Sequence, residues 1–128
     1  MRYLGIDFGS KRVGTALSNE AGLMAFPHEV YPNDANLLKT IVDVIETNQV
    51  EAVVIGHSIG RDGQPNEIHT AVESFMTDLT LQVPVPIHLE PEQYTTQEAI
   101  RFQGRTDKTD AAAAAIILNS FLAKQPKS

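Results

Sequence analysis

The spacing of apolar residues changes near residue 33 of this chain, and that change limits the folds it can adopt. The first part contains three short apolar or alternating runs, at residues 3–7, 12–18 and 23–31. Such runs predict β-strands, and the turn-forming residues between them leave room only for tight connections. Strands connected so closely pair with their sequence neighbours, so we expect an antiparallel meander. Pro27 lies inside the third run and predicts that this strand is at an edge or contains a bulge.

Beyond that point, helical and extended spacing alternate along the chain. The predicted elements are helices around 37–45 and 68–79, a buried strand at 52–55, a fifth strand at 85–89, and helices at 95–102 and 111–122. Asn33 or Asp34 is a candidate N-cap for the first helix. Thr95 and Glu98 have the spacing of a capping box, which predicts the start of the third.

The resulting order, β-β-β-α-β-α-β-α-α, predicts a mixed five-stranded sheet with helices on both faces, formed by a single domain over residues 1–128. Right-handed crossovers place the later strands parallel to the first. The small side chains at 111–115 would let the last helix approach the sheet closely. Its buried contacts are expected from Ile116, Ile117, Phe121 and Leu122.

Composition excludes several classes of protein. The chain has no cysteine, which excludes disulfides and thiolate metal sites and suits a reducing cytoplasm. No apolar run approaches the roughly 20 residues that cross a bilayer, so no membrane association is expected. A net charge of -6 weakly opposes nucleic-acid binding. However, six basic residues lie in or beside the predicted loops: Lys11, Arg12, Arg61, Arg101, Arg105 and Lys108.

Asp7 is the strongest single candidate for a functional residue. It ends a strand expected at the centre of the sheet and is followed by Gly9 and Gly14. Open sheets bind ligands at such strand ends, although an aspartate here can also simply form a turn. The same Asp-x-Gly-x-x-x-x-Gly pattern occurs in actin-like ATPases and sugar kinases. Those proteins need two such domains around a nucleotide, and this chain has room for one.

Three further acidic residues and one histidine are weaker candidates. Glu90 and Glu92 follow the predicted fifth strand and could bind a hard cation, or belong to a solvated turn. Asp110 lies in the first turn of the last helix, where the helix dipole alone already favours an acid. His57 follows Gly56 at a strand end and could face the same site, but the histidines show no metal-binding spacing.

Four segments of the chain resemble the YqgF (RuvX) family of Holliday junction resolvases and pre-ribosomal RNA nucleases. They are residues 5–14, residues 53–56 followed by Asp62 and Gly63, residues 92–99, and residues 110–118. Their order and spacing match the family over nearly the whole chain. Two departures stand out: the family's Asp-Glu-Arg reads Pro91-Glu92-Gln93 here, and its Gly-Leu-Pro reads Gly56-His57-Ser58.

The resemblance implies an RNase H-like fold and three acidic positions around Mg2+ or Mn2+. In this sequence they are Asp7, Glu92 and Asp110, with Glu90 as an additional candidate ligand that could replace the family's missing acid. Phosphate contacts are expected from nearby cationic side chains. The candidates are Lys11, Arg12 and Arg105, followed by Arg61 and Arg101.

A metal-dependent endonuclease that acts in the maturation of precursor ribosomal RNA is the function that this resemblance implies. Holliday junction resolution on branched DNA is an alternative, as are a degenerate module that binds nucleic acid without cutting it and a purely structural domain. The expected partner is structured RNA or branched DNA, and both a monomer and a homodimer fit the sequence.

Overall fold

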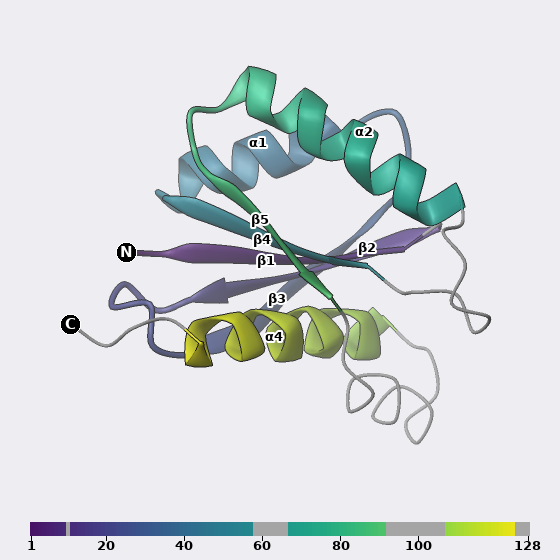
Figure 1. Cartoon of the computed structure of the whole chain (residues 1–128). Helices are drawn as coiled ribbons and strands as arrows, with labels where there is room; N and C mark the ends of the chain where they lie inside the picture. Colours follow the sequence, from purple (N-terminus) through teal and green to yellow (C-terminus); the bar gives the residue numbers. More distant parts are fainter. Residues whose placement is uncertain (10, 58–66, 92–106, 125–128) are drawn as a thin grey trace.

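The computed structural model describes residues 1–9, 11–57, 67–91 and 107–124. Five strands form one sheet in the order β3-β2-β1-β4-β5, with α1 and α2 on one face and α4 on the other (Figure 1). The elements are β1 (Tyr3–Phe8), β2 (Arg12–Ser18), β3 (Ala25–Pro32), α1 (Leu37–Thr47), β4 (Ala52–His57), α2 (Glu67–Gln82), β5 (Ile87–Pro91) and α4 (Asp107–Ala123). The predicted helix at 95–102 lies outside the described residues.

The strand directions confirm the predicted topology. β1, β2 and β3 pair antiparallel as a meander, whereas β4 pairs parallel to both β1 and β5. α1 connects β3 to β4, and α2 connects β4 to β5. Because both helices return the chain to the same end of the sheet, the carboxyl ends of β1, β4 and β5 share one edge.

β3 is both an edge strand and the site of a bulge, as Pro27 predicted. Between Gly14 and Ala16 the register of β2 against β3 shifts, because a proline cannot donate to the ladder. The buried Thr15 hydroxyl replaces the missing contacts. It donates to the carbonyl oxygen of Glu29 at 2.6 Å and accepts from the Glu29 N–H at 3.1 Å.

Each face of the sheet carries its own apolar cluster, because side chains alternate along a strand. Leu4, Ile6 and Phe8 of β1 point toward α1 and α2 and lie in one cluster. Ile117 and Leu118 of α4 lie in the other.

α4 packs closely on the sheet at two glycines. A Cβ atom at Gly5 would lie 2.7 Å from the Leu118 Cβ, and one at Gly56 would lie 2.5 Å from the Ile117 Cδ1. Small residues therefore permit the close approach, on both the helix and the sheet. Ile116 is 37% exposed, so the prediction that it supplies buried contacts is wrong. The helix instead turns Ala114, Ile117 and Leu118 toward the strands.

Two local predictions are corrected by the structure. The N-cap of α1 is Asn36, and its side chain makes no capping hydrogen bond. Asp34 accepts from the Asn36 N–H at 2.9 Å, while the Asn33 side chain contacts Gly9. Neither predicted residue therefore caps the helix. The second correction concerns Glu90, which lies inside β5 rather than after it.

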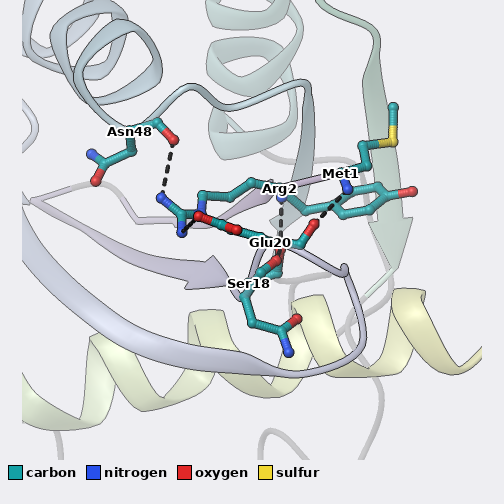
Figure 2. Close-up of polar contacts among 7 residues, drawn as sticks. Met1, Arg2, Ser18, Glu20 and Asn48 are labelled. Atoms are coloured by element: carbon teal, nitrogen blue, oxygen red, sulfur yellow. Dashed lines mark hydrogen bonds and ion pairs between the residues drawn. The ribbon is translucent and has the colours of Figure 1, made fainter.

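Polar contacts around Arg2 fix the end of the sheet that lies away from Asp7 (Figure 2). The Arg2 Nη1 donates to the carbonyl oxygen of Asn48, just after α1, at 3.2 Å. The Arg2 Nη2 lies 3.8 Å from the Glu20 Oε1 in the β2–β3 connection. The Tyr3 N–H donates to the Ser18 Oγ at 2.8 Å. Arg2 thus joins β1 to two connections at this end.

In the described part of the chain, no helix is long and apolar enough to span a membrane.

Candidate functional site

Asp7 lies near the carboxyl end of β1, the central strand of the sheet. It is opposite Gly14 of β2 on one side and Gly56 of β4 on the other, and it is only 8% exposed. Its side chain is on the α4 face, since it alternates with Leu4, Ile6 and Phe8. A buried carboxylate held by two neighbouring strands has little freedom to move, which is what a fixed ligand or catalytic group requires.

Glu90 lies in the same row of the sheet as Asp7, two strands away. The register pairs Asp7 with Gly56 and Gly56 with Glu90, so the two carboxylates start from backbones about 10 Å apart on one face. The Ile117 side chain packs directly on Gly56, between the two strands that carry the acids. An apolar side chain therefore occupies the space across which Asp7 and Glu90 would have to share a cation.

Glu90 already has polar partners at the end of α4: a cation just after the helix and a hydroxyl within it. Its carboxylate is 5% exposed and forms an ion pair with the Lys124 ammonium group, and the Ser120 hydroxyl lies 3.5 Å from the same oxygen. Lys124 itself is half exposed. This pairing favours a structural role for Glu90 over a place among metal ligands.

A tightly constrained turn follows Asp7. The Gly9 N–H donates to the carbonyl oxygen of Arg12 at 3.1 Å, and a Cβ atom at Gly9 would overlap that same oxygen. Asn33, just after β3, makes two further contacts: its Nδ2 donates to the Gly9 carbonyl at 2.8 Å and its N–H donates to the Lys11 carbonyl at 2.9 Å. Lys11 is exposed and Arg12 is half-buried. Two of the predicted phosphate-binding residues thus lie at the same edge as Asp7.

Tyr31 anchors the end of β3 just before Asn33. It packs against the α1/α2-side cluster opposite Val13. Burial, and then the charge of Glu29, raise the pKa of Tyr31 above its ordinary value of 10.0. The phenol is neutral at physiological pH, as an ordinary tyrosine is, and the raised pKa extends that neutral range to more alkaline pH.

Several predicted site residues lie outside what the structure describes. They are Glu92, Arg61, Arg101 and Arg105. Asp110 is in the first turn of α4 and His57 is the last residue of β4, but their side chains are not among those described. Within the described part of the chain, no three Asp, Glu, His or Cys side chains gather closely enough to hold a metal ion.

Among the described residues, Asn33 and Lys124 make contacts around the candidate site that sequence reasoning missed. Asn33 looked like a helix cap, and its partner Gly9 is 24 residues away. Lys124 is 34 residues from Glu90, near the end of the chain. No local spacing signals either contact.

Comparison with known proteins connects this geometry to a family. A family model described as "RuvX: Holliday junction resolvase" matches residues 1–124. A protein of Maridesulfovibrio salexigens named "Putative pre-16S rRNA nuclease" is 32% identical over 134 residues, which cover 97% of this chain and 99% of the relative. A Rickettsia akari protein of the same name is also 32% identical, over 93% of this chain and 84% of its own.

Solved structures confirm the predicted RNase H-like fold. The chain is similar to Thermus thermophilus RuvC in complex with a Holliday junction substrate, with a TM-score of 0.65 and 18% identity over 95% of this chain and 94% of the other. It is also similar to the fowlpox virus Holliday junction resolvase, with a TM-score of 0.59 and 12% identity over 98% and 100%. At such identities the likeness shows the fold alone.

Proposed function

Because the chain belongs to the RuvX family of nucleases, we propose that it is a metal-dependent endonuclease that hydrolyses phosphodiester bonds in precursor ribosomal RNA. The observation that carries the proposal is the buried carboxylate of Asp7 at the carboxyl end of the central strand. The segments that leave β4 and β5 start from the same edge, and the second of them begins with Glu92. RNA is proposed as the substrate because two relatives carry the name of a pre-16S rRNA nuclease.

The packing of α4 supports a place for Asp110 beside Asp7. The ring of Tyr3 is 5.9 Å from that of Phe121, and Gly5 lies against Leu118 and Ala114. The helix therefore runs antiparallel to β1, as Figure 1 also shows. Four residues of helix advance about 6 Å, close to the two-residue step along a strand. One more step of the same kind brings the first turn of α4 beside Asp7.

The donor chemistry at this edge fits a hard divalent cation, which prefers carboxylate oxygens. Asp7, Glu92 and Asp110 would hold Mg2+ or Mn2+. A pair of such ions supplies an activated water and neutralises charge on the phosphoryl oxygens. Asp7, held by strands on both sides, would be the most rigid of the three ligands.

Basic residues would hold the substrate in place. Lys11 and Arg12 would contact phosphates from the turn that follows Asp7. Arg105 is proposed for the same role, with Arg61 and Arg101 as further contacts. The bound cations would offset the negative charge of the acids, so that a polyanion can approach them.

Replacing Asp7 by asparagine tests the proposal, because the change keeps the shape of the side chain and removes its charge. We expect Asp7→Asn to abolish Mn2+-dependent cleavage of a precursor ribosomal RNA fragment. Asp43→Asn is the matched control, since Asp43 is an exposed acid on α1, on the other face of the sheet. Cleavage by Asp7→Asn at the rate of the unmodified protein would contradict the proposed site.

The same assay distinguishes the alternative substrates. A four-way DNA junction is tested beside the RNA, with the same variants and the same metal. Cleavage of the junction alone would assign the protein to branched DNA. Binding of either polymer without metal-dependent cleavage would identify a module that has lost its catalytic activity.

A further inference from the structure

We propose that Asn33 is a positioning residue for substrate: its side chain fixes the backbone that presents Lys11 and Arg12 to phosphate. This inference rests on the proposed function, because it assumes that these two residues contact nucleic acid. Asn33 lies between β3 and α1. It reaches the β1–β2 turn from outside that hairpin.

Three hydrogen bonds define the arrangement. The Asn33 Nδ2 donates to the carbonyl oxygen of Gly9 at 2.8 Å, and the Asn33 N–H donates to that of Lys11 at 2.9 Å. Within the turn, the Gly9 N–H donates to the Arg12 carbonyl at 3.1 Å. One residue thus holds the backbone on both sides of position 10.

Asn33 is itself well anchored. Tyr31, two residues earlier, packs against the apolar cluster on the α1/α2 face. Pro32 pairs with Arg12 at the last register position between β2 and β3. The amide group therefore extends from a fixed point, and its contact with Gly9 can set the position of the turn rather than follow it.

An exposed lysine on a free turn would sample many positions, and each phosphate contact would have to overcome that freedom. With the Gly9 and Lys11 carbonyls held, less backbone freedom at Lys11 remains to be lost on binding. Removing the side-chain donor should therefore weaken substrate binding more than it slows the chemical step.

Asn19 provides a matched control at the opposite end of the sheet. Its Oδ1 accepts from the backbone N–H groups of Leu23 and Met24, at 2.9 and 3.4 Å, in the connection between β2 and β3. Asn19→Ala thus removes an asparagine that fixes a turn, without touching the proposed site.

The experiment measures the Kd for a structured RNA without divalent metal, then kcat and KM with Mn2+, for Asn33→Ala, Asn33→Leu and Asn19→Ala. A hydrogen bond of ordinary net strength corresponds to a rise of roughly three- to tenfold in Kd and KM for both Asn33 variants. We expect a smaller change in kcat, and Kd and KM unchanged in Asn19→Ala. Asn33→Leu keeps the side chain's approximate size, adds no charge and lacks the donor, so it separates the hydrogen bond from packing.

A double-mutant cycle with Lys11→Ala gives a readout that a purely structural role would not produce. If Asn33 acts through Lys11, the effect of Lys11→Ala on Kd should be smaller in the Asn33→Ala background. Additive effects, or a Kd for Asn33→Ala that matches Asn19→Ala, would overturn the inference. Loss of folding in both Asn33 variants while Asn19→Ala folds would assign Asn33 to stability and would overturn it as well.

Failure of this inference and failure of the proposed function give different results. If the unmodified protein neither binds nor cleaves nucleic acid, the proposed function fails. If it cleaves RNA in an Asp7-dependent way and the Asn33 variants behave like Asn19→Ala, only the positioning role fails.

Discussion

Two buried carboxylates in one row of the sheet have different surroundings. Asp7 lies at the centre of the sheet, whereas Glu90 is on the edge strand β5 and is paired with Lys124. A buried charge is tolerated when it is paired, and removing one partner leaves the other desolvated without compensation. The Lys124 ammonium therefore accounts for a buried glutamate without any metal.

Lys124→Met tests this assignment at the level of single residues. We expect it to lower the free energy of unfolding by about 1–3 kcal/mol, because the Glu90 carboxylate loses its partner. The loss stays in this range because Lys124 is half exposed, so water can partly replace its ammonium group beside Glu90. Urea unfolding gives the value, and Lys39→Met is the control because Lys39 is exposed on α1.

The double variant Glu90→Gln/Lys124→Met should recover part of the lost stability, because no buried charge is then left unpaired. Mn2+ binding by Glu90→Gln should match that of the unmodified protein. A clear loss of Mn2+ affinity in Glu90→Gln would instead place Glu90 among the metal ligands.

At the scale of elements, β3 shows how the sheet completes its hydrogen bonds at an irregular edge. Thr15 supplies a side-chain donor and acceptor where the bulge disrupts the ladder. The amide of Asn119 in α4 does the same for Ala25, accepting from its N–H at 2.8 Å and donating to its carbonyl at 3.3 Å. β3 ends at Pro32, so the hydrogen bonds that hold this strand also help to fix the position of Asn33 beside the candidate site.

Thr15→Val keeps the shape of the side chain and removes its hydroxyl. Because Thr15 is fully buried, we expect the two backbone groups of Glu29 to lose their partner and unfolding to become easier by about 1–3 kcal/mol. Thr77→Val is the control, since the exposed Thr77 hydroxyl donates to the carbonyl oxygen of Glu73 in its own helix, and its effect should stay within about 0.5 kcal/mol. Equal effects in the two variants would show that the bulge does not depend on the hydroxyl.

The order of the described elements and the strand pairing could be predicted from the sequence, because spacing and crossover handedness are local or general rules. The end of β5 could not be predicted in this way. An acidic residue such as Glu90 reads as part of a loop unless its distant partner Lys124 is known. The same reason hid the role of Asn33, whose short polar side chain suits a helix cap equally well. Asp7 could be found because its signal, an acid ending a central apolar strand, is local.

At the scale of the whole molecule, the described parts of α1 and α2 carry several exposed acids. The exposed acids Asp43 and Glu46 on α1 and Glu73 and Asp78 on α2 lie on one side of the sheet. Nucleic acid should avoid that side, because phosphate contacts require basic groups. Lys11 and Arg12 lie instead at the edge where β1 ends, so a chain of net charge -6 can still bind a polyanion locally.

The salt dependence of binding tests this picture. Each phosphate contact adds about one unit to the slope of log K against log salt, so Lys11→Ala should reduce that slope by about one. Lys39→Ala, on the α1 side, should leave it unchanged. Fluorescence anisotropy of labelled RNA over a range of salt concentrations measures both. An equal reduction in the two variants would indicate that binding is not confined to the proposed edge.

Gly5 and Gly56, the two glycines against which α4 packs, fix the position of that helix along its own axis. Leu118 and Ile117 fit where Gly5 and Gly56 lack side chains, so a shift of α4 by one turn would force large side chains against the strands. The distance of Asp110 from the sheet edge is therefore determined by where these residues dock, seven and eight positions along the helix. Any ion coordinated at that first turn would depend for its geometry on residues that never contact it.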